Sequence, residues 1–253
     1  MEKIILITGA TSGFGKATAE KFAANQWNCI ITGRRADRLH KIADELREKY
    51  QVKILPLVFD VQNKIQVQEQ LGNLPDTWKN IDVLVNNAGL ALGRDSFQEA
   101  SLEDWDTMLD TNVKGLAYVT KTIIPNMMLR KGGHIFNIGS TAAKEVYPNG
   151  NGYCASKHAV DALSKSMRID LLPYGIKVTG VHPGAADTEF SQVRFKGDEE
   201  KANSIYVGYK PLYANDIADI IFYCANLPEH VCINDLVVTC TAQANNFNFY
   251  KEL

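Results

Sequence analysis

A tyrosine and a lysine lie four residues apart in the stretch Tyr153-Cys154-Ala155-Ser156-Lys157. On a helix this spacing places the phenol and the ammonium on one face. A tyrosine exchanges protons poorly near neutral pH, because the reference pKa of a phenol is about 10. A fixed positive charge nearby favours the phenolate, so Tyr153 and Lys157 could act as a proton-transfer pair. The spacing alone is weak evidence, since it arises often by chance.

A glycine-rich turn near the N-terminus makes this pair more informative. Residues 8–15 read Thr-Gly-Ala-Thr-Ser-Gly-Phe-Gly, between an apolar run and an amphipathic stretch. Glycines permit a tight turn and close backbone approach, and the N–H groups at a helix N-terminus bind a pyrophosphate. The glycine spacing differs from Gly-x-Gly-x-x-Gly, but the strand–turn–helix context of a dinucleotide site is present. A purely structural turn is the alternative. The predicted cofactor contacts are Gly9, Thr11, Ser12, Gly13, Phe14 and Gly15.

The end of the next expected strand indicates which dinucleotide binds. Enzymes that prefer NAD commonly have a carboxylate there for the ribose 2′-hydroxyl. This chain has Gly33 instead, followed by Arg34 and Arg35, whose forked donors suit a 2′-phosphate. Arg38, one turn into the following helix, could add a third charge. We therefore predict NADP(H) in preference to NAD(H), with a solvated basic helix start as the alternative.

Two further strand ends carry polar or small residues. Asp60 follows the third expected strand and could accept a hydrogen bond from the adenine amino group, or it could cap a helix. The fourth strand ends in residues 86–89, Asn-Asn-Ala-Gly, where amides can brace the sheet end and small residues let the nucleotide come close. The predicted cofactor contacts from these ends are Asp60, Val61, Asn87, Ala88 and Gly89.

The elements that must position these residues alternate along the chain. Short β-branched runs, several of them apolar at consecutive positions, alternate with stretches of helical periodicity. This pattern predicts a single-domain α/β fold: a Rossmann-type, doubly wound, seven-stranded parallel sheet with helices on both faces. The expected strands are 3–8, 28–33, 53–58, 81–85, 133–139, 177–182 and 235–239. The expected helices are 14–25, 36–49, 64–74, 102–130, 153–174 and 215–226.

Residues 184–213 interrupt this alternation, because they carry few periodic apolar residues. A stretch of this length in a compact domain is usually a lid or a binding segment. We therefore expect residues 1–253 to form one domain with a flexible substrate flap at about 184–213.

Composition excludes several classes of protein. The formal net charge is −2 and the pI is near 6.2, so nothing attracts the chain to nucleic acid or to an anionic membrane. No run approaches about 18 consecutive apolar residues, so we expect no membrane-spanning helix. The five cysteines contain no Cys-x-x-Cys pair and the histidines no His-Glu-x-x-His pattern, so we expect no metal site. A cytoplasmic protein is the expectation.

Together these residues resemble the short-chain dehydrogenase/reductase family. The matching signs, in the order of the family, are Thr8–Gly15, Asn86–Gly89, Asn112, Ser140, Tyr153-x-x-x-Lys157 and Pro183-Gly184. The chain is most similar to the branch of NADP-dependent 3-hydroxy acid (serine/allo-threonine) dehydrogenases. The stretches that carry this likeness are Gly33–Arg35, Asn86–Gly93 and Thr188–Asp198.

The resemblance implies a catalytic tetrad of Asn112, Ser140, Tyr153 and Lys157. Tyr153 would exchange a proton with the substrate oxygen. Lys157 would lower the tyrosine pKa, helped by the positive charge of the oxidised nicotinamide, and would hold the ribose hydroxyls. Ser140 would hydrogen-bond the substrate oxygen, and Asn112 would anchor a water that connects Lys157 to solvent. The residues implied to cover the nicotinamide are Pro183, Gly184 and Thr188.

A 3-hydroxy acid also needs a partner for its carboxylate. Arg194 and Lys196, in the flap, are the candidates, with a solvated charged loop as the alternative. The resemblance implies L-serine, L-allo-threonine, 3-hydroxyisobutyrate and 3-hydroxypropionate or malonic semialdehyde as substrates. A broad carbonyl or 3-oxoacyl reductase and a non-catalytic NADP(H)-sensing protein are the alternatives. The family usually forms homotetramers, and residues 242–253 could dock on a neighbouring subunit.

Overall fold

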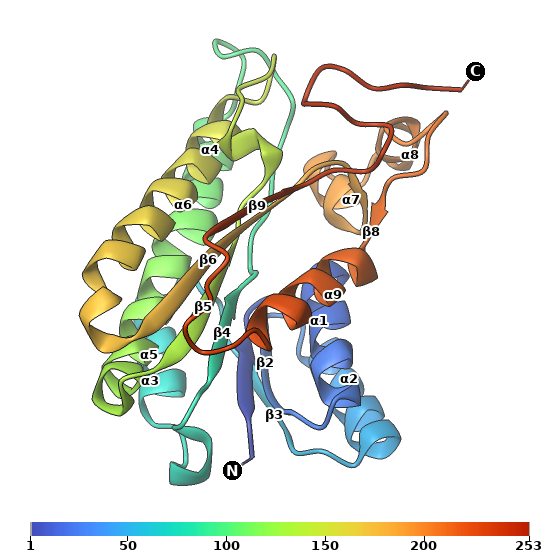
Figure 1. Cartoon of the computed structure of the whole chain (residues 1–253). Coiled ribbons are helices and arrows are strands. Elements are labelled where there is room, and N and C mark those ends of the chain that lie inside the picture. The colour runs from blue at the N-terminus through green and yellow to red at the C-terminus, as the bar shows by residue number, and fades with distance from the viewer. Residues whose placement is uncertain (1, 253) are drawn as a thin grey trace.

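The computed structural model describes residues 2–252, with all their side chains except those of residues 202 and 203. Its central sheet has seven parallel strands in the order β3-β2-β1-β4-β5-β6-β9 (Figure 1). This is the doubly wound Rossmann order, so the predicted fold class is confirmed. The strands are β1 (Ile4–Ile7), β2 (Asn28–Gly33), β3 (Ile54–Val58), β4 (Val83–Asn86), β5 (Gly133–Ile138), β6 (Ile176–Pro183) and β9 (Asp235–Val238).

Helices cover both faces of this sheet (Figure 1). One face carries α1 (Gly13–Ala24), α2 (Ala36–Tyr50) and α9 (Ala214–Ala225). The other carries α3 (Lys64–Gly72), α5 (Leu116–Arg130) and α6 (Asn151–Asp170), with α4 (Leu102–Leu109) packed beside α6. The described residues also include short 3-10 helices at Asp76–Trp78, Thr141–Ala143 and Leu172–Tyr174.

Strand β1 shows why runs of consecutive apolar residues become central strands. All four of its side chains are buried. Ile5 and Ile7 pack into the core beneath α1, α2 and α9, whereas Ile4 and Leu6 pack into the core on the opposite face. Because successive side chains of a strand point to opposite faces, only an apolar residue at every position satisfies both layers.

One expected helix, residues 102–130, is divided in the structure. Helix α4 ends at Leu109, a π-helical segment follows over Asp110–Gly115, and α5 continues from Leu116. Single π-helical turns occur often at functional sites, and this one contains Asn112. The periodicity of the apolar residues did not reveal the additional residue in that turn.

The flap contains short elements of its own. They are β7 (Ala186–Asp187), α7 (Phe190–Arg194), α8 (Glu199–Ser204) and β8 (Leu212–Tyr213), and β7 pairs with β8 in a second, two-stranded sheet. The predicted bounds of the flap and its flexibility stay predictions.

The C-terminal tail after β9 folds back onto its own chain, near α8 (Figure 1). A β-bridge joins Gln243 to Phe249, and the Glu252 N–H donates to the carbonyl of Gly208 in the flap. The side chain of Asn246 donates to the carbonyl oxygens of Thr141 and Glu145. The tail therefore connects the flap with the turn that follows β5. The predicted contact of this segment with a neighbouring subunit stays a prediction.

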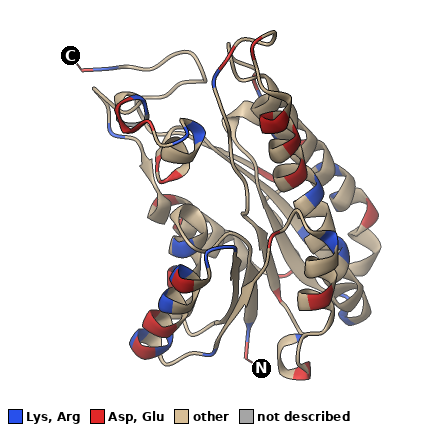
Figure 2. Ribbon diagram, turned by 180° about the vertical axis from the view of Figure 1, so that it is seen from behind, with Lys and Arg blue, Asp and Glu red and all other residues tan. Residues whose placement is uncertain are grey.

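Charged residues of both signs are interspersed along the outer helices (Figure 2). This mixture agrees with the small net charge of the sequence. Within residues 2–252, no helix has the length and the apolar character that crossing a membrane would need.

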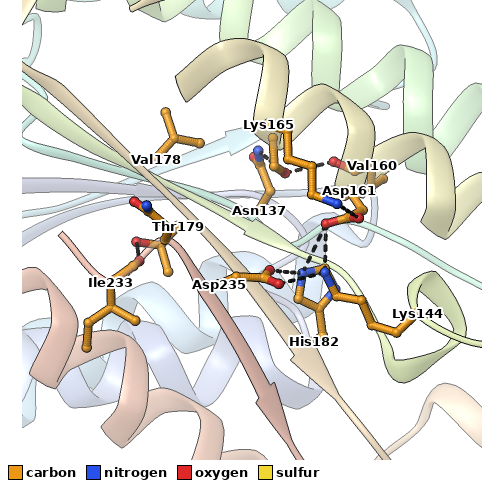
Figure 3. Close-up of polar contacts among 12 residues, drawn as sticks. Asn137, Lys144, Val160, Asp161, Lys165, Val178, Thr179, His182, Ile233 and Asp235 are labelled. Atoms are coloured by element: carbon orange, nitrogen blue, oxygen red, sulfur yellow. Dashed lines mark hydrogen bonds and ion pairs between the residues drawn. The ribbon is translucent and has the colours of Figure 1, made fainter. Parts of the chain in front are cut away.

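An ion-pair network joins α6 to the sheet edge (Figure 3). The Lys144 ammonium lies 2.9 Å from Asp161 Oδ1 and 2.7 Å from Asp235 Oδ2, and Nε2 of the buried His182 lies 2.7 Å from Asp235 Oδ1. The two carboxylates and the imidazole are close enough to ligate a metal ion, but the Lys144 ammonium already contacts both carboxylates. Since Asp161 lies one helical turn beyond Lys157, the network fixes the helix that carries the tyrosine–lysine pair.

Replacing Lys144 with methionine should lower the free energy of unfolding by about 1–3 kcal/mol near pH 7, because the buried Asp161 loses a partner. Burial would raise the pKa of Asp161, but hydrogen bonds from Lys165 and Lys144 hold it below its ordinary value. A lowered carboxyl pKa gives stability that is present above the unfolded-state pKa and is lost on acidification. The difference between variant and wild type should therefore shrink below about pH 4.

Urea denaturation near pH 7 and near pH 3 measures both quantities. Lys144→Arg keeps the charge and is the matched control. An equal loss of stability at the two pH values would contradict this role of the network.

Candidate active site

Most of the predicted site residues meet in one cleft of about 900 Å³ at the carboxyl ends of the strands. Ligand pockets of about 300–1,000 Å³ are typical, and this one is at the upper end, as a dinucleotide with a small substrate requires. The predicted residues that line it are Gly9, Thr11, Ser12, Gly13, Phe14, Arg34, Arg35, Asp60, Val61, Asn87, Ala88, Gly89, Ser140, Tyr153, Lys157, Pro183, Gly184, Thr188 and Arg194. Four predicted residues do not line it: Gly15, Arg38, Asn112 and Lys196.

The glycine turn has the form that a pyrophosphate requires. Gly9 and Gly13 have positive φ angles of 67° and 51°, in which a side chain would be strained. A Cβ on Gly15 would lie 2.5 Å from the carbonyl oxygen of Gly9, so the turn is too tight for any other residue. Ser12, the N-cap of α1, makes no side-chain capping bond, which leaves the first N–H groups of this helix available to an anion. These residues therefore fit the predicted dinucleotide.

Arg35 lies beside this turn. Its guanidinium donates to the hydroxyl of Thr11 over 2.7 Å and to that of Ser12 over 2.8 Å, which holds it at the edge of the cleft. Arg38 lies behind it, with Nη1 3.0 Å from a carboxylate oxygen of Glu189 in the flap. The structure thus brings Arg35 and Arg38, two of the three arginines predicted to bind the 2′-phosphate, close together. Arg38 does not line the cleft.

Asp60 faces the cleft at the end of β3. Its Oδ2 lies 3.3 Å from Nη1 of Arg34. The alternative role of helix cap belongs to Asn63, whose side chain accepts two N–H groups of α3. The Asp60 Oδ1 also accepts the Gln62 N–H over 3.0 Å, and the predicted contact of Asp60 with the adenine stays a prediction.

Helix α6 places Tyr153 and Lys157 on one face, as their spacing predicted. Both are buried, with 8% and 5% of their surface exposed. The Lys157 ammonium donates to the carbonyl of Ile138, at the end of β5, over 2.8 Å and lies 5.8 Å from the centre of the Tyr153 ring. A Cβ on Gly89 would lie 3.4 Å from this nitrogen, so the glycine keeps the space beside the ammonium open.

Burial governs the acid–base properties of both groups. It lowers the pKa of Lys157 to about 8 and raises the pKa of Tyr153. A hydrogen bond with Ser140 and the charge of Arg194 act on Tyr153 in the opposite direction. Burial outweighs the charges of the side chains around the phenol. The predicted lowering of the tyrosine pKa by Lys157 together with the oxidised nicotinamide stays a prediction. Ionisation of Tyr153 therefore needs positive charge in addition to these side chains.

Asn112 supports the site from the π-helical segment. Its Nδ2 donates to the Leu90 carbonyl and to the Ser156 hydroxyl, and its Oδ1 accepts from the Leu90 N–H, each over 2.9 Å. Asn112 therefore ties the loop after β4 to α6 and to the tyrosine–lysine pair. Its predicted role as the anchor of a water stays a prediction.

Arg194, at the end of α7, reaches the tyrosine. The central carbon of its guanidinium lies 5.6 Å from the centre of the Tyr153 ring and 5.5 Å from that of Tyr147. Its Nε and Nη2 atoms are buried and have no hydrogen-bond partner among the described residues. Buried donors without acceptors are costly, and a planar guanidinium matches a carboxylate with two parallel bonds. The arrangement can hold an anionic substrate beside the phenol.

The structure does not place Lys196 in the substrate site, contrary to the sequence-based expectation. Its ammonium lies 2.8 Å from Oδ2 of Asp104 in α4, and 60% of its side chain is exposed. The carboxylate neutralises this lysine and holds it on the outer side of the loop that follows α7.

Several residues of the cleft were not identified from the sequence. Tyr147, Glu189 and Phe190 line it, and the Phe190 ring centre lies 5.5 Å from that of Tyr153. Burial raises the pKa of Tyr147, so it is a neutral phenol near pH 7. The tail contributes Gln243, Asn246, Phe247, Phe249 and Lys251. All of these lie in loops, in the flap or in the tail, where no periodicity assigns a side chain to the cleft.

Comparisons with known proteins agree with this site. Residues 3–199 match the family model of the short chain dehydrogenases. The chain is 46% identical over 242 residues to the NADP-dependent 3-hydroxy acid dehydrogenase YdfG of Salmonella typhi, covering 95% of this chain and 96% of that protein. It is 44% identical over 245 residues to sulfoacetaldehyde reductase 2 of Chromohalobacter salexigens, covering 96% of each.

Among solved structures, the chain resembles the closed form of a serine dehydrogenase complexed with NADP+. The TM-score is 0.91 at 43% sequence identity, covering 98% of this chain and 100% of the other. Both the matched length and the geometry of the cleft lead to one conclusion: the chain belongs to the short-chain dehydrogenase family.

Proposed function

We propose that this protein transfers a hydride between NADP(H) and a small 3-hydroxy acid or the corresponding carbonyl acid. The candidates are L-serine, L-allo-threonine, 3-hydroxyisobutyrate and 3-hydroxypropionate or malonic semialdehyde. The observation that carries this substrate class is Arg194, whose guanidinium lies beside Tyr153 and whose Nε and Nη2 are buried without a hydrogen-bond partner among the described residues. A substrate with a hydroxyl at one end and an anion at the other would satisfy both groups.

Each member of the site has a distinct part in the proposed reaction. In reduction, Tyr153 donates its phenolic proton to the carbonyl oxygen, and in oxidation it removes the hydroxyl proton. The hydroxyl of Ser140 donates a hydrogen bond to the same oxygen, and the charged Lys157 stabilises the phenolate. When bound, the nicotinamide supplies or accepts the hydride at C4. Pro183, Gly184 and Thr188 line the cleft where they would cover the ring.

The preference for the phosphorylated cofactor rests on the arginines beyond β2. Arg34 and Arg35 line the cleft beside the glycine turn, and the strand end that would carry a competing carboxylate is Gly33. Two relatives whose names or titles specify NADP share this chain's length almost completely. We therefore infer NADP(H) as the cofactor, bound through its 2′-phosphate.

A sulfonate substrate is the second candidate. One relative at 44% identity is named sulfoacetaldehyde reductase 2, and the oxygens of a sulfonate, like those of a carboxylate, accept hydrogen bonds from a guanidinium. A panel of hydroxy acids, sulfoacetaldehyde and bulky ketones, followed at the 340 nm band of NADPH, separates these functions. It also tests the carbonyl-reductase and the non-catalytic alternatives.

The family resemblance also leads us to propose a homotetramer. Leu129, Ile169 and Leu172 are exposed at the ends of α5 and α6, where a partner could cover them. Light scattering of the purified protein tests this assembly.

Arg194→Ala should raise the KM of the anionic substrate at least tenfold, because a charged hydrogen-bonding partner is removed from a buried site. The KM of NADPH should change little. Steady-state kinetics with malonic semialdehyde measures both constants, and Lys196→Ala is the matched control in the same flap. A KM unchanged in Arg194→Ala would exclude this residue from substrate binding.

Tyr153→Phe should lower kcat by about a hundredfold or more, the usual scale for the loss of a general acid. The dissociation constant of NADPH, measured by fluorescence titration, should stay within about twofold. Turnover close to wild type would refute the proposed role of the phenol.

The lowered pKa of Lys157 gives a prediction for stability. The unfolded chain keeps this lysine protonated up to about pH 10.5, whereas burial releases its proton at about 8. Between these pH values the unfolded state therefore binds more protons than the folded state. The destabilisation that the buried lysine causes becomes smaller as pH rises. Relative to Lys157→Met, the wild type should gain stability between about pH 8 and 10.5. Thermal unfolding across this range measures it, and parallel curves would contradict it.

A further inference from the structure

Glu189, a residue of the flap with no assigned role, binds two of the arginines predicted for the 2′-phosphate. Its Oε2 lies 2.8 Å from Nη1 of Arg35, and its Oε1 lies 3.0 Å from Nη1 of Arg38. These contacts join residues that are 154 and 151 positions apart in the sequence. Because Arg35 also donates to Thr11 and Ser12, the carboxylate attaches the flap to the glycine turn itself.

Helix α7 carries this contact to the other end of the cleft. Glu189 is its N-cap and Arg194 is its last residue. Phe190, its first residue, packs against Tyr153, and the N–H of Gly93 donates to the Arg194 carbonyl over 3.0 Å. A single helical segment therefore has one end on the phosphate-binding arginines and the other on the phenol. Among the hydrogen bonds and ion pairs of the described residues, those of Glu189 are the ones that link α7 to Arg35 and Arg38 at the start of α2.

The charges around Glu189 make its contact sensitive to the cofactor. Three arginines (Arg34, Arg35 and Arg38) face two carboxylates (Asp60 and Glu189), which leaves one positive charge. A 2′-phosphate brings about two negative charges to the same guanidinium groups. The Glu189 carboxylate therefore repels the phosphate of NADP(H), and it has no comparable effect on NAD(H), which carries a hydroxyl there.

We propose that Glu189 is a positioning and specificity residue that shares the Arg35–Arg38 pair with the 2′-phosphate. It closes α7 over the cleft, places Arg194 at Tyr153, and weakens NADP(H) binding while doing so. The predicted change in substrate KM rests on the proposed function. The predicted changes in cofactor affinity and in hydrogen exchange of α7 do not. The enzyme thereby gains a closed substrate site at the expense of affinity for its cofactor, which favours release of the cofactor after turnover.

Glu189→Gln tests the proposal. NADPH should bind about three- to tenfold more tightly, because one repelling charge is removed at close range, and NADH should bind as before within about twofold. The gain for NADPH should decline at high salt, as expected for partly exposed charges. Amide hydrogen exchange across residues 190–195 should become faster in the cofactor-free variant, because α7 has lost its attachment. The KM of the hydroxy acid should rise about fivefold or more, with kcat within about threefold.

Asp198→Asn is the matched control. Asp198 also lies in the flap, and its ion pair among the described residues is with Lys201, 2.9 Å away, so its removal changes the same charge without touching the arginines. The proposal is overturned if Glu189→Gln binds NADPH no more tightly than the wild type, or if its affinity for NADH increases by the same factor. It is also overturned if hydrogen exchange in α7 is unchanged, or if the substrate KM stays at the wild-type value. Absence of turnover with every hydroxy acid in the wild type counts against the proposed function instead, since the binding and exchange measurements need no substrate.

Discussion

The buried ammonium of Lys157 is the constraint on which the rest of the site depends. A lysine is buried only at considerable cost, and here the Ile138 carbonyl at the end of β5 accepts a hydrogen bond from its ammonium while Gly89 leaves space beside it. Both partners come from ends of parallel strands that the sheet brings together. The lysine in turn lies one helical turn from Tyr153 on α6. The doubly wound sheet thus positions the groups that replace part of the hydration of the buried ammonium.

The cleft combines a rigid side and a covering side. The strand ends, the glycine turn and α6 form the first, and they are held by the sheet, by Asn112 and by the Lys144 network. The flap and the tail form the second, and they provide Arg194, Glu189 and the aromatic residues. The groups proposed for proton transfer, Tyr153 and Lys157, belong to the side formed by the sheet and α6, whereas Arg194, proposed to bind the substrate anion, belongs to the covering side.

The sequence was sufficient for the parts of the structure that local rules determine. Apolar runs such as Ile4–Ile7 identified central strands, and the spacing of Tyr153 and Lys157 identified one face of α6. Features that depend on contacts between distant segments were missed or wrong. Glu189 and Tyr147 lie in irregular segments, and nothing in the sequence places them opposite Arg35 or Arg194. Lys196 was a candidate for the substrate carboxylate, with a solvated loop as the alternative, and the sequence could not decide because its partner, Asp104, comes from another element.

The π-helical turn at Asp110–Gly115 also constrains how this chain can evolve. It sets the rotation of α4 relative to α5, and α4 meets α6 closely: the Trp105 indole donates to Asn151 over 3.0 Å. Insertion or loss of one residue in this turn would rotate α4 by about 100° and turn Trp105 away from its partner. The length of this segment is therefore as restricted as the identity of Asn112. Among descendants of this sequence, insertions and deletions within Asp110–Gly115 should be rarer than substitutions.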